Sequence, residues 1–269
     1  MLSAKPAPTA HSGRLFLTLL AMLLTTTTTR AWSGQGTSAD PYQIANANDL
    51  AQLATNVNGG TDYNNLYFKQ TADITLSGAW TPIGTESHPF KGHYDGGSFA
   101  IRGLQVTGDY KYAGLFGYIV SGDYVPQLGF YRPAELKDIN IVDCNINVGT
   151  FSDSNAGGIA GQVNTVLMSG CRVSGTITGY GNACGLTSTH ATLGVSVTDC
   201  FVDVTVSGTG NQYNQYITPK VYQMIYTGAG TGGGSGNYYH DNGGSVAVSN
   251  ATSISNSARS STPLPPPAA

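Results

Sequence analysis

The chain has 269 residues, of which 12 are Lys or Arg and 15 are Asp or Glu, so its formal net charge is −3. Charged residues make up only 10% of the chain, whereas 36 residues are Gly, about twice the usual share of glycine. This composition excludes a basic nucleic-acid-binding protein and a long helical or coiled-coil protein. Many β-branched and turn residues favour an all-β protein with many short strands.

The N-terminus has the pattern of a secretory signal peptide. Residues 1–14 carry basic but no acidic side chains, and the apolar run Leu15–Leu24 follows. This run is too short to span a bilayer, which needs about 20 residues. The small residue Ala31 suits a cleavage site. We therefore predict that residues 1–31 are a signal peptide and that the mature chain is secreted or displayed at the cell surface.

One helix is predicted in the mature chain, from Asp49 to Val57, with Asn48 as its N-cap. Its apolar face would consist of residues at helical spacing, namely Leu50, Leu53, Ala54 and Val57. The run Asn58-Gly59-Gly60 would end the helix. We expect residues 32–70 or so to form a cap over the open end of a stacked β structure.

Three similar segments around Cys144, Cys171 and Cys200 indicate an internal repeat with a period in the high twenties. Strands that alternate with Gly turns at this period predict a solenoid, because each repeat buries its apolar face only against its neighbours. The predicted fold is all-β, a right-handed parallel β-helix over residues 32–261, followed by a Pro-rich tail over 262–269. We expect the three Cys residues to stack in one column as buried free thiols, with a disulfide as the alternative.

Several segments resemble bacterial secreted and surface proteins that carry GLUG repeats. They include Trp32–Ile44, Trp80–Gly84 and Phe90–Gly97. The run Gly114-Leu115-Phe116-Gly117 matches the repeat motif fully, and Gly158-Ile159-Ala160-Gly161 is a looser copy. The resemblance implies a right-handed parallel β-helix from a host-associated bacterium of the Bacteroides type. It also implies a role as an adhesin or as an accessory segment of a surface immunoglobulin-A peptidase, with no catalytic residue among the matched ones.

The same motif has a physical interpretation without the family. Glycines at its ends permit tight bends where a side chain would clash, and the two apolar residues between them enter the core.

Catalytic chemistry has weak support in the sequence. Glycoside hydrolysis uses a pair of carboxylates, and the chain contains only two Glu residues, Glu86 and Glu135. The Asp candidates are Asp138, Asp143, Asp199 and Asp203. We therefore expect a non-catalytic protein, and a carbohydrate-active β-helix enzyme, either a polysaccharide lyase or a glycosidase, is the alternative.

A metal site is also not predicted. Glu86, His88, His93 and Asp95 lie within ten residues, but turn and strand roles account for this segment. No cofactor is indicated, and calcium stays open as an alternative.

Tyrosines in irregular segments are the candidate ligand-binding residues, because tyrosine rings stack on sugar rings. They are Tyr131, with its neighbour Arg132, and Tyr213 and Tyr216. The alternative is that these rings pack over the open end of the stack. We expect a surface module of the adhesin type that binds a glycan or a host protein, or presents a neighbouring domain. A structural surface protein without a specific ligand is a further alternative, and no nucleic-acid partner or membrane span is predicted.

Overall fold

The computed structural model describes Met1, residues 32–127, 129–149, 154–189 and 195–208, and the backbone of five later strands. The chain divides into two compact units, Met1–Arg30 and Ala31–Ala269, and the second contains every described helix and strand. Residues 2–31 of the predicted signal peptide, the Pro-rich tail and the candidate residues Tyr213 and Tyr216 lie outside the described residues.

Four parallel sheets make up the fold, and we number them I to IV in the order in which the chain enters them. Sheet I contains β1 (Tyr42–Ile44), β2 (Tyr67–Gln70), β4 (His93–Asp95), β11 (Ala134–Lys137), β15 (Val166–Ser169), β19 (Val195–Thr198) and β23 (Gly232–Gly233). Sheet II contains β3 (Ile74–Thr75), β5 (Ala100–Arg102), β6 (Gln105–Gly108), β12 (Asn140–Val148), β16 (Arg172–Gly179), β20 (Phe201–Gly208), β24 (Asn237–His240) and β25 (Ala251–Ile254).

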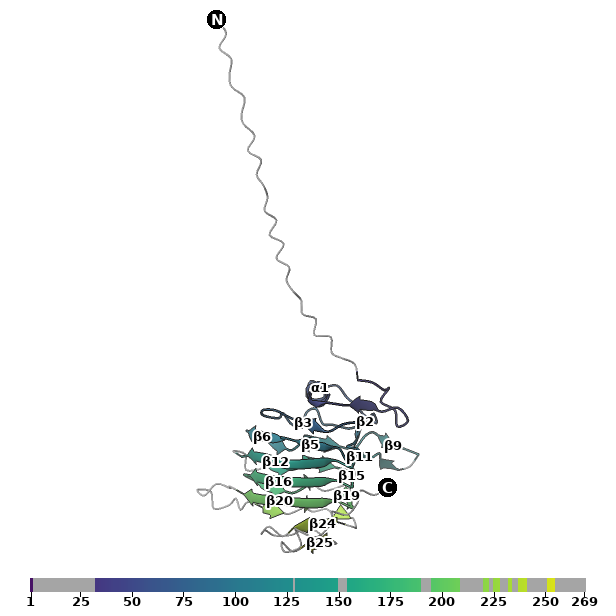
Figure 1. Cartoon of the computed structure of the whole chain (residues 1–269). Coiled ribbons are helices and arrows are strands. Elements are labelled where there is room, and N and C mark those ends of the chain that lie inside the picture. The colour runs from purple at the N-terminus through teal and green to yellow at the C-terminus, as the bar shows by residue number, and fades with distance from the viewer. Residues whose placement is uncertain are drawn as a thin grey trace. The chain divides into compact units, whose positions relative to one another are not determined.

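The two remaining parallel sheets are smaller. Sheet III contains β7 (Tyr112–Ala113), β13 (Asn155–Gly157), β17 (Asn182–Cys184) and β21 (Lys220–Tyr222). Sheet IV contains β8 (Phe116–Val120), β14 (Ala160–Asn164), β18 (Thr187–Thr189) and β22 (Ile225–Thr227). A separate antiparallel hairpin consists of β9 (Tyr124–Val125) and β10 (Phe130–Tyr131), and Figure 1 shows β9 at the side of the stack.

The chain passes through the four sheets in turn and then returns to the first. The strands β11, β12, β13 and β14 form one such passage, which we call a layer, and β15, β16, β17 and β18 form the next. Neighbouring layers pair in parallel, so that Ile146 lies opposite Ile177, which lies opposite Val206. Figure 1 shows β12, β16 and β20 one beneath another. The prediction of a mostly β chain with parallel strands is confirmed.

Alternation along each strand places apolar side chains in one continuous core. In β12 the side chains of Ile141, Cys144, Ile146 and Val148 are buried, whereas those of Asn145 and Asn147 are exposed. This is the period-two pattern of a sheet with one buried face. The core therefore runs from layer to layer beneath all four sheets.

The turn from sheet I to sheet II is two residues long in three layers, and its first residue has positive φ in each. These residues are Asp138, Gly170 and Asp199, with φ of 52, 63 and 53°. Asp is among the few residues with a side chain that tolerate this left-handed region. Asp138 and Asp199 are therefore turn residues in this fold.

The helix α1 extends from Ala47 to Asn58, so it begins earlier than predicted. The N-cap is Asn46, whose side chain accepts hydrogen bonds from the backbone N–H groups of Asn48 and Asp49, and the assignment of Asn48 was wrong. Asp49 Oδ2 accepts in turn from the backbone N–H of Ala45 at 3.0 Å. The predicted apolar face is confirmed, since Leu50, Leu53, Ala54 and Val57 are all buried. Figure 1 shows α1 at the end of the stack, beyond β2 and β3.

The segments Gly114–Gly117 and Gly158–Gly161 stack on each other at the turn between sheets III and IV. Leu115, Phe116, Ile159 and Ala160 are fully buried, and Phe116 pairs with Ala160. The backbone N–H of Leu115 donates to the carbonyl of Gly158 at 3.2 Å, and that of Phe116 donates to Ile159 at 2.8 Å. A Cβ atom at Gly114 or Gly161 would collide with backbone atoms of the neighbouring layer. Close approach between layers is thus the physical requirement for these glycines.

The predicted column of three Cys residues is wrong. Cys171 and Cys200 occupy equivalent positions directly before β16 and β20, but Cys144 lies inside β12 opposite Gly175. A bulge between Ile141 and Cys144, with Asp143 at a φ of 55°, shifts the register there. All four Cys residues are buried thiols that form no disulfide, and burial raises the pKa of the Cys144 thiol to about 12.

Candidate functional site

Three strands of sheet I carry the same pattern, in which a buried residue separates two outward-facing polar or aromatic ones. The patterns are Tyr67-Phe68-Lys69, His93-Tyr94-Asp95 and Glu135-Leu136-Lys137, and the three central side chains are buried in the core. The six flanking side chains line a cleft of about 400 Å³, which the segment containing Ser38, Ala39 and Pro41 bounds on one side. We call it the β2–β4–β11 cleft.

The first row of the cleft consists of Tyr67, His93 and Glu135. The phenol ring of Tyr67 stacks on the imidazole of His93, with ring centroids 4.2 Å apart and planes inclined by 13°. His93 is only 5% exposed, and neither of its ring nitrogens has a hydrogen-bond partner. The nearest carboxylate is that of Glu135, whose Oε2 lies 4.0 Å from His93 Nδ1.

The second row consists of Lys69, Asp95 and Lys137, which lie opposite one another on three neighbouring strands. Both ammonium groups approach the same carboxylate oxygen, Asp95 Oδ2, at 3.7 Å for Lys69 and 3.2 Å for Lys137. The other oxygen, Asp95 Oδ1, accepts a hydrogen bond from the backbone N–H of Gly97 at 2.8 Å. Asp95 is therefore engaged at both oxygens.

The electrostatic surroundings favour the neutral form of His93. Burial lowers the pKa of His93 below its usual value, because the imidazolium would lose its hydration. The charge of Arg132 also lowers this pKa, whereas Glu135 opposes the shift. His93 therefore enters the cleft as an uncharged ring that supports Tyr67.

An aromatic cluster fixes the side of the cleft nearest the N-terminus. The indole of Trp32 packs against the rings of Tyr42, Tyr63 and Phe68 at centroid distances of 5.4 to 5.9 Å. This cluster ties β1 to β2, and the segment that bounds the cleft leads directly into β1. The wall of the cleft is thus anchored in the core.

Of the residues singled out from the sequence, His93, Asp95 and Glu135 line the cleft, but Tyr131 and Arg132 do not. Tyr131 is exposed on the β9–β10 hairpin and forms an edge-to-face pair with Tyr124. Sequence reasoning missed Tyr67, Lys69 and Lys137, although alternation around a buried residue is a signal that they share with His93 and Asp95.

The segment considered for a metal site is divided in the structure. Glu86 pairs with Lys111 at 3.0 Å, whereas His93 and Asp95 face the cleft. Among the side chains that the structure describes, no group of three or more His, Cys, Asp or Glu could hold a metal ion.

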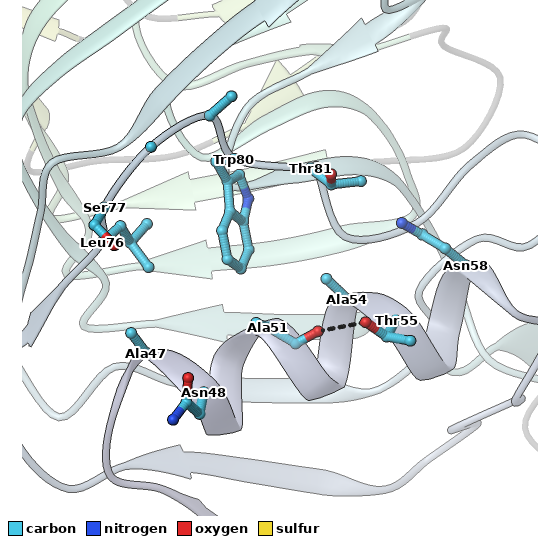
Figure 2. Close-up of a pocket in the computed structure, with 12 residues that line it drawn as sticks. Ala47, Asn48, Ala51, Ala54, Thr55, Asn58, Leu76, Ser77, Trp80 and Thr81 are labelled. Atoms are coloured by element: carbon cyan, nitrogen blue, oxygen red, sulfur yellow. Dashed lines mark hydrogen bonds between the residues drawn. The ribbon is translucent and has the colours of Figure 1, made fainter. Parts of the chain in front are cut away.

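A second concavity lies between α1 and the segment 76–81 and has a volume of about 470 Å³. Figure 2 shows the Trp80 ring pointing from that segment toward Ala51 and Ala54 of the helix. The indole N–H donates to the main-chain carbonyl of Leu115 at 3.0 Å. The residues that line this concavity are all uncharged, whereas charged side chains line the β2–β4–β11 cleft.

No family model matches the chain. A 110-residue stretch is 30% identical to a protein described as a Gly-rich membrane protein from Evansella cellulosilytica. The match covers 34% of this chain and 12% of that protein. A crystal structure described as an immunoglobulin A1 protease from Bacteroides ovatus superposes on 83% of this chain and 79% of its own, with a TM-score of 0.41 and 16% identity. In the described part of the chain no helix is long and apolar enough to cross a membrane.

Proposed function

We propose that the protein is a secreted or cell-surface, non-catalytic module that binds a glycan in the β2–β4–β11 cleft. In this proposal the stacked layers form a right-handed parallel β-helix of the GLUG-repeat type with α1 as its cap. The in-step pairing of the motif copies Gly114–Gly117 and Gly158–Gly161 supports this architecture.

The observation that carries the binding proposal is the Tyr67 ring beside charged side chains in a cleft. Sugar sites combine an aromatic face, which packs against the apolar side of a pyranose, with polar groups that bond hydroxyls. Tyr67 is held in place by His93, and Lys69, Glu135 and Lys137 supply donors and acceptors around it. The volume of about 400 Å³ lies within the range of small-ligand sites, which is roughly 300–1,000 Å³.

The state of Asp95 favours binding over catalysis. A carboxylate acting as acid, base or nucleophile must reach the substrate. Asp95 already accepts the Gly97 N–H with one oxygen and faces two ammonium groups with the other. This leaves Glu135 as the available acid in the cleft, whereas glycoside hydrolysis uses two.

A glycan array probed with the full chain tests the proposal. We expect specific binding that is lost in Tyr67→Ala and retained in Tyr118→Ala. Tyr118 is the matched control because its half-buried ring stacks on Tyr112, at 5.1 Å and 22°, outside the cleft.

A blank array, or equal binding by both variants, would contradict the proposal.

A second experiment separates binding from catalysis. Glycans that bind on the array are incubated with the protein and assayed for new reducing ends and unsaturated products. Intact glycans support a non-catalytic module, and cleavage products would establish the carbohydrate-active enzyme instead.

A further inference from the structure

The second row of the cleft has an uneven charge. Two ammonium groups, those of Lys69 and Lys137, share the one carboxylate of Asp95. The Lys69–Asp95–Lys137 row thus holds one positive charge more than its carboxylate neutralises, in a chain whose net charge is −3. With Glu135 of the first row counted, the charged side chains of the cleft balance, so the positive charge is confined to the second row. The next acidic group in electrostatic contact with both lysines is Asp138.

Both ammonium groups remain accessible from the cleft. The side chain of Lys69 is 49% exposed and that of Lys137 is 51% exposed, whereas Asp95 between them is 19% exposed. Their strands lie on either side of β4, so the backbones are separated by about twice the strand spacing of 4.8 Å. An anionic group above Asp95 could contact both ammonium groups at once.

The first row carries a negative charge, whereas the second row carries a positive one. The two ends of the cleft would therefore attract different parts of a ligand. Tyr67 and the neutral His93 form an apolar ring stack, and Glu135 stands exposed at its end. Glu135 precedes Lys137 by two residues on β11, which places the two Cα atoms about 6.6 Å apart. The Glu135 carboxylate at this end of the cleft can accept hydrogen bonds from sugar hydroxyls, and it repels anions.

We propose that the cleft selects glycans that carry an anionic substituent, a carboxylate or a sulfate, bound between Lys69 and Lys137. The sugar ring packs on Tyr67, and a hydroxyl donates to Glu135. This inference rests on the proposed glycan-binding function and adds the chemical class of the ligand. Charge-assisted bonds from two lysines supply the selectivity, because such bonds are about twice as strong as neutral ones.

The test uses matched pairs of glycans on one array and in calorimetry with the full chain. Oligomers of galacturonic acid are compared with their methyl esters, and sulfated galactose oligomers with their desulfated forms. We expect the charged member of a pair to bind at least tenfold more tightly, with the advantage decreasing as salt rises. The two pairs distinguish a carboxylate ligand from a sulfate ligand.

Lys69→Gln and Lys137→Gln should each weaken binding of the charged member by about tenfold, corresponding to about 1.4 kcal/mol. Each should weaken binding of the neutral member by less, because the Gln amide still donates to sugar hydroxyls but carries no charge. Each single change leaves Asp95 with one lysine, so the fold is expected to persist, and the melting temperature checks this. Lys91→Gln is the control, because Lys91 forms an ion pair with Asp62 outside the cleft.

Equal affinity for charged and neutral members, or full binding in both lysine variants, would overturn the inference while leaving glycan binding intact. Absence of binding to every member would overturn the proposed function itself.

Discussion

His93 combines strong burial with an absence of hydrogen bonds. Its ring stacks on Tyr67, its Nδ1 lies 4.0 Å from Glu135 Oε2, and neither ring nitrogen has a hydrogen-bond partner. A buried polar atom without a partner costs free energy, and the cost grows if the group is charged. Protonation would add the cost of a buried charge, so the folded protein favours the neutral imidazole.

Folding stability should therefore depend on pH through His93. Its pKa in the folded protein lies below the unfolded value of about 6.5. The stability that neutral His93 contributes is complete above about pH 6.5 and decreases as pH falls toward the folded pKa, because the unfolded chain binds the proton more readily. Melting temperatures measured between pH 7.5 and 5.5 should decrease less in His93→Gln than in the wild type.

His88→Gln is the control for this pH dependence, because His88 is exposed. It should retain the wild-type decrease in melting temperature. An unchanged pH dependence in His93→Gln would contradict the assignment to His93.

The capping of α1 shows how a short polar motif defines an element. Asn46 satisfies two N–H groups of the first turn, and Asp49 reaches back to the N–H of Ala45. Removing such a cap typically costs about 1 kcal/mol. Asn46→Ala should therefore lower the free energy of unfolding by about 1 kcal/mol, as measured by denaturant titration.

Asn48→Ala provides the comparison, because Asn48 is exposed in the first turn and does not cap the helix. We expect a change within about 0.5 kcal/mol, as for most surface substitutions. A larger loss for Asn48 than for Asn46 would contradict the cap assignment.

The sequence predicted the helix and its buried face because Leu50, Leu53, Ala54 and Val57 follow a helical period. It misplaced the N-cap because Asn46 and Asn48 are the same residue type two positions apart, and only hydrogen-bond geometry separates them. The Cys column failed for a related reason. A bulge in β12 changes the spacing between layers without leaving a distinctive residue pattern.

The candidate cleft was harder to predict than any single element. Its side chains come from three segments that become neighbours only when layers pair in register. The hairpin between β8 and β11 also lengthens the chain between His93 and Glu135, so no constant period links the three strands. Alternation shows which side chains face outward, but the partners across strands depend on the register of the whole molecule.

At the scale of the whole molecule, stability depends on close contact between layers. Gly117 is buried, and a Cβ atom there would collide with the carbonyl oxygen of Gly84. Overpacking of this kind typically costs about 1–3 kcal/mol. Gly117→Ala should lower the free energy of unfolding by this amount in denaturant titration.

Gly59→Ala is the comparison for Gly117, because Gly59 has a φ of −78° and its Cβ would approach only backbone carbonyls, at 3.1 Å or more. Gly59→Ala should lower the free energy of unfolding by less than Gly117→Ala does. An equal loss in both variants would show that the contact between layers does not cause the loss in Gly117→Ala.

The corner where sheet IV leads back to sheet I has a consequence for the evolution of the chain. In one layer, the single residue Thr165 connects β14 to β15, and in the preceding layer, residues 121–133 connect β8 to β11 and include the hairpin. Both layers nevertheless keep the same register, since Val120 pairs with Asn164 and Ala134 pairs with Val166. This corner accepts inserted segments of different length without disturbing the pairing. It is therefore the place where descendants of the gene can gain, exchange or lose a surface peptide, and where a foreign epitope can be grafted.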